Sequence, residues 1–506
     1  MNSTTFIRMA IRTGRPLLLI AILVLSTMLP SFAEQPPSLY PKREMRAVWL
    51  TTLYGLDWPK ARTAALQRQE IDRMLDSLRS AHFNTVFIQV RGRGDVIYKS
   101  KFEPVMLPFR SAMSQDKSYD PLSYVIQGCH DRGMECHAWM VTLKMANVSE
   151  FRHAPKDSYI KRYRAHTIRH NGEIYMDPAS EHARRFLADM AEELASNYDI
   201  DGIHLDYIRY PERAEKLQDQ RSYKRSKTNL SHSAWREENI HRTVSMIYDR
   251  VKSVKPHIQV SASPIGKYSN GVKNNGHVWT AKESVHQDPV AWKRSGKIDF
   301  VVPMMYFKGE DFFYHLKKWN REMDGKMVAG LASYKMLKSQ GGWDYTDLKQ
   351  QIDSCRAESG VGGICFFRAE QLFDNKYGLW NYLRQEAFTR PALLPLRSSS
   401  PAAPESVPEI TDFSLHGDTL VAEWSYAGKD SPTFNIYISM DGNDVRTETS
   451  EYLSRIGIKE KKLTIPLGNI PEDTLIQITV TAYTTEYAES APAHSAVYYH
   501  RPKEQQ

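Results

Sequence analysis

Short apolar runs alternate with longer amphipathic segments along most of this chain. The runs are rich in Val, Ile and aromatic residues, and the segments between them repeat apolar residues at helical spacing. Alternation of this kind over residues 44–390 predicts a parallel sheet, because parallel strands need helical crossovers between them. Eight strand-helix pairs can be recognised, and eight is the number at which such a sheet closes into a (β/α)8 TIM barrel. The expected fold class is therefore α/β.

The pattern gives approximate bounds for each expected element. The expected strands are residues 45–50, 84–91, 135–141, a short run within 201–211, 258–263, 299–306, 327–333 and 363–368. The expected helices are residues 63–82, 121–132, 180–198, 234–255, 289–295, 312–323, 347–359 and 377–388.

Residues 201–211, Asp-Gly-Ile-His-Leu-Asp-Tyr-Ile-Arg-Tyr-Pro, are the most informative stretch. Side chains alternate along a strand, so Ile203 and Leu205 share one face while His204 and Asp206 share the other. An apolar face against helices and a polar face turned inward are typical of a barrel strand that carries catalytic groups at its C-terminal end. Asp206 is predicted to lie at that end.

The pattern changes after the barrel. Residues 391–406 are rich in Pro and Ser and lack apolar periodicity, which predicts a linker. Residues 407–500 contain apolar runs of period two separated by turns, which predict a small all-β sandwich. A Trp on an early strand, Trp424, and Val480-Thr481-Ala482-Tyr483 on a late one resemble a fibronectin type III module.

The N-terminus reads as a secretory signal peptide of residues 1–33. Arg8, Arg12 and Arg15 precede an apolar run over residues 17–29, and Ser-Phe-Ala ends at Ala33. The apolar run is shorter than the roughly 20 residues that span a bilayer, which favours cleavage over an uncleaved anchor. A periplasmic or secreted protein is expected.

The composition of the chain argues against several classes of function. The whole chain has 67 Lys and Arg against 59 Asp and Glu, a net charge of +8, and loss of the leader removes three positive charges. This bias is too small to indicate nucleic-acid binding, and no nucleotide-binding loop is present. The four Cys lack the paired spacing of a zinc site and are expected as buried free thiols. No cofactor is predicted.

Carboxylates at the ends of the predicted strands are the candidate catalytic groups. Asp206 is the first candidate, with Tyr207 and Arg209 beside it as substrate-binding residues, and Glu370 after the eighth strand is the second. Two carboxylates across a cleft are the minimum for hydrolysis of a glycosidic bond, one as proton donor and one as nucleophile or base. Three further carboxylates also follow barrel strands, namely Asp95, Glu212 and Asp288.

Each carboxylate has a plainer interpretation. Asp206 would be structural if Arg209 or Arg91 held it in a buried ion pair. Glu370 and Glu212 would be solvated loop residues, and turn capping would account for Asp95 and Asp288.

Histidines on the inward strand faces are the residues that would bind a metal ion if this protein had a metal site. His137 shares a strand face with Trp139, and either His137 or His204 could be a core histidine or a cleft residue. No close-spaced histidine pair supports a metal site, so none is predicted. The basic stretch 144–170 is predicted as solvated surface, with contact to an anionic or N-acetylated glycan as the alternative.

Several motifs occur in an order that resembles the bacterial glycosyl-hydrolase-like family 10. They are residues 45–50, 84–91 with Gly94, Asp95 and Tyr98, 120–122, 133–139, 201–211, 287–288 and 298–306. The resemblance spans about residues 44–388 and implies a TIM barrel acting on bacterial or dietary polysaccharide, in some relatives on the glycan strands of peptidoglycan. It also implies that Asp206 is an active-site residue and that Arg91, His137, Trp139, His204, Tyr207 and Tyr306 line the cleft.

The leading hypothesis is an exported glycoside hydrolase that cleaves a cell-wall or other polysaccharide, with cell-envelope attachment through the C-terminal module. A non-catalytic glycan-binding or scaffold protein is the alternative. A third interpretation, a metal-dependent deacetylase, would require three ligands converging around Asp206.

Overall fold

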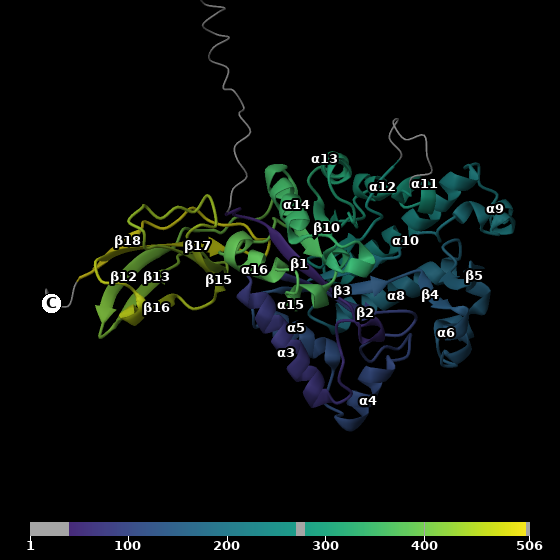
Figure 1. Cartoon of the computed structure of the whole chain (residues 1–506), viewed down its shortest axis with the longest axis horizontal. Coiled ribbons are helices and arrows are strands. Elements are labelled where there is room, and N and C mark those ends of the chain that lie inside the picture. Colours follow the sequence, from purple (N-terminus) through teal and green to yellow (C-terminus); the bar gives the residue numbers. More distant parts are fainter. Residues whose placement is uncertain (1–39, 270–278, 399, 502–506) are drawn as a thin grey trace, which may run out of the picture. The chain divides into compact units, whose positions relative to one another are not determined.

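The computed structural model describes residues 40–269, 279–398 and 400–501. The predicted signal peptide lies outside the described residues. Eight parallel strands close a barrel in the order β1-β11-β10-β9-β8-β7-β3-β2, which confirms the predicted α/β barrel (Figure 1). The barrel strands are β1 (Met45–Leu50), β2 (Thr85–Arg91), β3 (Glu135–Val141), β7 (Gly202–Asp206), β8 (Gln259–Ala262), β9 (Phe300–Val301), β10 (Met327–Leu331) and β11 (Val361–Phe366).

Helices follow the strands along the chain. Their first turns are set by local sequence: Asp120 accepts hydrogen bonds from the backbone N–H of Leu122 and Ser123, each 3.0 Å long, and Pro121 occupies the first helical position. The helices of the barrel region are α3 (Ala64–Ser80), α4 (Leu107–Gln115), α5 (Pro121–His130), α6 (Val148–His153), α7 (Tyr159–Arg162), α8 (Glu181–Asn197), α9 (Gln220–Arg225), α10 (His232–Val254), α11 (Ala281–Val285), α12 (Pro289–Arg294), α13 (Glu310–Met323), α14 (Tyr345–Ala357), α15 (Ala369–Phe373) and α16 (Leu379–Tyr382).

The two faces of β7 are buried in different ways. Ile203 and Leu205 belong to the large apolar cluster between the strands and the surrounding helices. His204 faces the barrel interior, with its ring centroid 4.5 Å from that of Phe87 and 5.8 Å from that of Trp49. The alternation predicted for this strand is thus the alternation observed.

Two elements differ from their predicted extent. The strand expected over residues 299–306 is regular only at Phe300–Val301, because Pro303 has no N–H to donate; beyond it, Met304 forms isolated bridges to Ile265 and Gly330. The helix expected over residues 377–388 is α16 followed by a π-helical turn at Leu383–Ala387.

The segment between β3 and β7 contains a small sheet that the sequence pattern did not predict. Strands β4 (Lys144–Asn147), β5 (Thr167–His170) and β6 (Glu173–Met176) pair in the order β4-β6-β5, with antiparallel neighbours. Strands β4 and β5 lie within the stretch 144–170, which was predicted as a solvated basic surface. The sheet places Lys144 immediately after the end of β3.

The C-terminal region is all-β. Its two antiparallel sheets have the orders β12-β13-β16 and β15-β14-β17-β18, and Trp424, Phe434, Ile436, Ile478 and Val480 share their core. The strands are β12 (Glu409–His416), β13 (Thr419–Ser425), β14 (Thr433–Ser439), β15 (Leu453–Ile458), β16 (Lys462–Pro466), β17 (Thr474–Tyr483) and β18 (Ala496–His500).

The start of the predicted linker is hydrogen-bonded to the segment that immediately precedes β1. Leu393 is fully buried, its N–H donates to Lys42 over 2.9 Å, and its carbonyl accepts from Glu44 over 2.8 Å. None of the described helices has the length and apolarity required to cross a membrane.

Candidate active site

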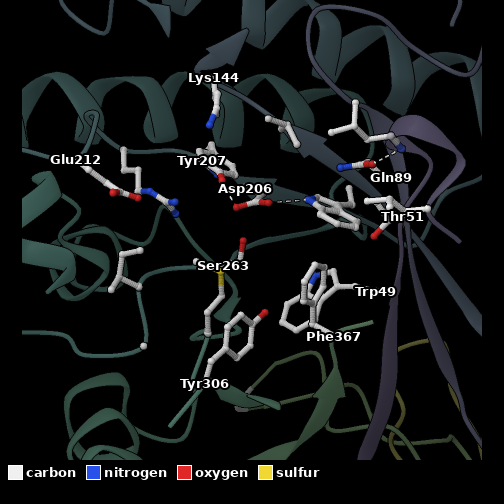
Figure 2. A pocket seen from close by; sticks show the side chains of 18 of the residues that line it. Trp49, Thr51, Gln89, Lys144, Asp206, Tyr207, Glu212, Ser263, Tyr306 and Phe367 are labelled. Atoms are coloured by element: carbon white, nitrogen blue, oxygen red, sulfur yellow. Dashed lines mark hydrogen bonds between the residues drawn. The ribbon is translucent and has the colours of Figure 1, made fainter. Parts of the chain in front are cut away.

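A cavity of about 590 Å³ opens at the C-terminal end of the barrel strands. Its wall includes the ends of β1, β3, β7 and β8 and the loops after them, so it lies where barrel enzymes place their active sites. In Figure 2 the side chains of Asp206 and Ser263 project toward the same open space, with Tyr306 and Phe367 beside it. The predicted residues Asp206, Trp139, Tyr207, Arg209 and Tyr306 all line this cavity.

Asp206 is the last residue of β7 and is 7% exposed. Its Oδ2 accepts a hydrogen bond of 3.2 Å from the indole Nε1 of Trp139, and its Oδ1 accepts one of 2.7 Å from the N–H of Tyr207. Its own carbonyl accepts from the N–H of Thr142 at 2.8 Å and from the Thr142 hydroxyl at 2.7 Å. The end of β7 is therefore held rigidly against the end of β3.

Burial raises the pKa of Asp206, and the positive charge of Arg209 opposes this rise without cancelling it. A carboxyl group with a raised pKa keeps its proton at higher pH than an exposed aspartate does. Asp206 thus has the electrostatic property required of a proton donor.

Tyr207, directly after Asp206, has a φ of +50°. This left-handed conformation is uncommon for a bulky residue, and strained residues of this kind cluster at active sites and ligand clamps. The Tyr207 ring lies 4.2 Å from the guanidinium carbon of Arg209 and 5.3 Å from the Lys144 Nζ. The unusual backbone of Tyr207 therefore accompanies an aromatic ring with two cations close to it.

The ion pair that would make Asp206 structural is not found among the described residues. Arg91 is fully buried, but its partner is Glu103, at 2.6 Å. Arg209 approaches Asp206 closely enough to influence its pKa, yet the two form no ion pair within 4.0 Å in the described part of the chain.

Glu212 is the second carboxylate of the cavity wall. It is exposed and belongs to the loop after β7, and Figure 2 places it on the side of the cavity away from Thr51 and Gln89. Among the described residues, Asp206 and Glu212 are the carboxylates that line this cavity.

Glu370 lies in the first turn of α15 and outside the lining of the cavity. Its carboxylate pairs with Arg368 and lies 3.6 Å from Lys60 Nζ, and its side chain is 43% exposed. Its backbone N–H donates to Asp57, a buried carboxylate that the sequence analysis did not single out. The structure thus gives Glu370 a place in a surface ion-pair network.

Asp95 and Asp288 also lie away from this cavity. Asp95 lines a smaller cavity of about 250 Å³ nearby, where burial and the neighbouring Glu103 raise its pKa to about 6. Asp288 caps α12 and binds Lys282 Nζ at 2.7 Å, as the capping interpretation predicts.

The two inward histidines are fully buried in the barrel beneath the cavity. His204 Nε2 accepts from the indole Nε1 of Trp49 at 3.1 Å, so its Nδ1 carries the proton and donates to the Ser261 hydroxyl at 2.8 Å. Burial lowers the pKa of His204 well below its usual range. His137 Nε2 lies 3.1 Å from Glu135 Oε2.

These contacts bear on the three ligands that a metal-dependent deacetylase would need. The imidazoles of His137 and His204 are directed toward Glu135, Trp49 and Ser261 rather than toward Asp206. The described residues contain no group of three or more His, Cys, Asp or Glu side chains that could hold a metal ion. The four cysteines are buried and unpaired.

Aromatic rings make up much of the remaining wall. Tyr306 and Phe367 are stacked, with centroids 5.9 Å apart and planes 13° apart, and Phe367 contacts Trp49 and Trp139 edge-on. Trp279 adds an indole that is 45% exposed. Flat apolar faces next to polar groups suit the binding of sugar rings.

Several lining residues were not singled out as candidates from the sequence. Phe367 and Ser263 follow the ends of β11 and β8, and this position at a strand end was the available signal. Lys144 and Trp279 belong to connecting segments, where no periodic pattern fixes the direction of a side chain.

Comparisons with known proteins find a matching family and several similar chains. The family model described as "Glycosyl hydrolase-like 10" matches residues 44–335, more than half of the chain. "Glycosyl hydrolase YngK" of Bacillus subtilis (strain 168) is 26% identical over 395 residues, covering 72% of this chain and 76% of that protein. "Glycosyl hydrolase DigH" of Escherichia coli (strain K12) is 26% identical over 410 residues, covering 71% and 93% respectively. Among solved structures, the PgaB (BpsB) glycoside hydrolase domain from Bordetella bronchiseptica aligns with a TM-score of 0.49 and 13% identity, covering 68% of this chain and 99% of that one.

Proposed function

Since this chain belongs to the glycosyl hydrolase-like 10 family, we propose that it is an exported glycoside hydrolase that cleaves O-glycosidic bonds of a bacterial cell-wall glycan or another polysaccharide. The observation that supports the proposal most strongly is the environment of Asp206. This carboxyl group lies in the wall of an aromatic cavity at the C-terminal end of the barrel, burial raises its pKa, and two hydrogen bonds fix its position. The names of YngK and DigH, both glycosyl hydrolases, are consistent with it.

In the proposed reaction Asp206 donates its proton to the leaving glycosidic oxygen while the bond from that oxygen to the anomeric carbon breaks. Glu212 acts at the anomeric carbon, either directly as nucleophile or as the base that takes a proton from attacking water. In both cases water supplies the hydroxyl group of the new reducing end. Glu212 takes this role instead of Glu370 because Glu212 lines the cavity, whereas Glu370 is engaged with Arg368 and Lys60.

The rest of the site supports binding of a sugar chain. Trp49, Trp139, Tyr306 and Phe367 provide aromatic surface in the cavity wall, and stacking on such surface is tolerant of ring type. A non-catalytic glycan-binding protein would have no need for a buried carboxyl group that is free of an arginine partner. The lack of an Asp206 ion pair among the described residues therefore favours the hydrolase over the scaffold.

Export and attachment are parts of the same proposal. The basic residues and apolar run within residues 1–33 support a cleaved signal peptide. The C-terminal all-β region would then be a fibronectin type III-like module that holds the enzyme at the cell envelope, which is where a cell-wall glycan would be met.

The experiment is a substrate panel with the mature protein. Peptide-free peptidoglycan strands and a set of plant and host polysaccharides are incubated with wild type, Glu212→Gln and Glu370→Gln, and new reducing ends are counted. We expect one substrate class to be cleaved, a loss of about a hundredfold or more in rate for Glu212→Gln, and near wild-type rates for Glu370→Gln. Binding to a glycan without any new reducing ends would replace the hydrolase proposal by the scaffold.

A further inference from the structure

Arg209 is a buried cation that forms no ion pair within 4.0 Å in the described part of the chain. It is 6% exposed and lines the cavity three residues after Asp206. Its guanidinium carbon lies 4.2 Å from the ring centroid of Tyr207 and 5.8 Å from that of Trp279. Two aromatic rings therefore contact the guanidinium group through cation–π interactions. These contacts do not provide hydrogen-bond acceptors for its N–H groups.

The other cations of the cavity wall differ from Arg209 in this respect. Lys267 pairs with Asp311 at 2.8 Å, Arg93 with Glu150 at 2.9 Å, and Lys144 with Glu173 at 3.5 Å. Within the described part of the chain Arg209 forms no ion pair, and its Nη1 is buried without a hydrogen-bond partner. A buried polar group left unpaired is costly, so this residue is prepared for a ligand that brings its own acceptors.

We propose that Arg209 forms a subsite for a sugar that carries a carboxylate, next to the bond that Asp206 and Glu212 would cleave. A guanidinium offers two parallel N–H donors that match the two oxygens of a carboxylate. A neutral sugar hydroxyl would accept only one such bond and would leave the charge uncompensated. This inference rests on the proposed hydrolase function and defines the substrate class more narrowly.

Binding of a carboxylate there would also act on Asp206. The charge of Arg209 opposes the rise in the pKa of Asp206, and an anion bound to Arg209 would weaken that opposition. Asp206 would then keep its proton more firmly when an acidic sugar is in place. An acidic substrate would therefore be bound more tightly and would meet a better-prepared proton donor.

The test uses matched substrates that differ only in the carboxylate. Peptide-free peptidoglycan strands carry it as a lactyl ether, and polyuronate oligosaccharides carry it on the ring; in a parallel batch of each, the carboxylates are reduced to alcohols. Rates are measured for wild type, Arg209→Gln and Arg209→Lys. Arg93→Gln is the matched control, because Arg93 lines the same cavity but already has Glu150 as partner.

We expect wild type to prefer one acidic substrate over its reduced form by about 10-fold to 100-fold in kcat/KM, mainly through KM. Arg209→Gln should remove that preference, so that its kcat/KM values on the acidic and the reduced substrate become similar, whereas Arg209→Lys should retain part of it. Arg93→Gln should keep the preference. The source of the carboxylate follows from which of the two acidic substrates is preferred.

Equal rates of wild type on acidic and reduced substrates would overturn the proposal. So would an Arg209→Gln variant that slows both forms alike or unfolds at a lower temperature, because such a residue would serve the fold or Asp206 alone. If wild type cleaves nothing, the hydrolase proposal fails separately. Calorimetric binding of the acidic and reduced glycans to wild type and Arg209→Gln then decides whether the carboxylate subsite exists.

Discussion

The indole Nε1 of Trp139 donates a hydrogen bond of 3.2 Å to Oδ2 of Asp206, and this bond joins the ends of two adjacent barrel strands, β3 and β7. The donor favours the ionised form of the carboxyl group, whereas burial favours the protonated form. Trp139 therefore both orients the proposed proton donor and limits how far its pKa rises.

Replacing Trp139 by Phe tests this relationship. Phe keeps an aromatic ring but loses the N–H, so the pKa of Asp206 should rise further. Since the proposed donor must be protonated, the high-pH limb of the kcat/KM profile should move upward by about one pH unit. Trp292→Phe is the control, because the Trp292 indole N–H is buried without a hydrogen-bond partner in the described structure. An unchanged limb in Trp139→Phe would show that this bond does not tune the donor.

Glycine at position 202 should be essential for packing inside the barrel. A Cβ at Gly202 would lie 2.1 Å from Nδ1 of His137, well inside contact distance. We expect Gly202→Ala to lower the free energy of unfolding by about 2 to 3 kcal/mol in urea titrations. Gly468→Ala, where a Cβ would meet no atom within 4 Å, should be near neutral. Equal stabilities of the two variants would contradict the observed packing of β7 against β3.

Acid should destabilise the protein through Glu135. Burial alone would raise the pKa of Glu135, but His137 and Arg397 outweigh it and lower the pKa to about 2. A lowered folded-state pKa means that the unfolded chain takes up the proton first, so the stabilisation is present above pH 4.5 and is lost as pH falls toward 2. Its loss should cost about 3 kcal/mol.

Urea titrations across that pH range measure the effect, with Glu135→Gln as the comparison. The variant should be less stable at pH 7, because it removes the carboxylate that contacts Arg397 at 2.6 Å and His137 at 3.1 Å. Its stability should also depend less on pH between 4.5 and 2. A wild-type protein whose stability is constant over this interval would show that Glu135 is not held as described.

The periodicity of apolar residues was sufficient to predict the barrel, but not to predict how deep each inward-facing residue lies within it. Alternation correctly placed His204 and Asp206 on the inner face of β7, because one face of that strand must contact helices. It could not tell how far along the barrel axis each inward residue lies. Asp206 therefore reaches the cavity wall, while His137 and His204, on the same kind of inward face, are buried beneath it.

The sequence also could not predict which residues, distant along the chain, form ion pairs with the candidate site residues. Arg91 was expected in the cleft, but its guanidinium is taken by Glu103 from the loop after β2, and no spacing rule pairs these two residues. Glu370 looked like a second cavity carboxylate because it follows β11, yet the turn into α15 directs it to Arg368. Glu212, from the loop after β7, instead lines the cavity. The direction of loop side chains depends on contacts that only the folded chain reveals.

The measurement that tests the account most directly is the hydrolysis rate and the melting temperature of Asp206→Asn in one preparation. The raised pKa means that the ionised carboxylate is a burden on the folded state at neutral pH, so a neutral Asn should leave the melting temperature unchanged or higher. We expect this together with a fall in rate of about a thousandfold or more. A fully active variant, or one that loses activity only because its melting temperature falls, would contradict the assignment of Asp206 as the proton donor.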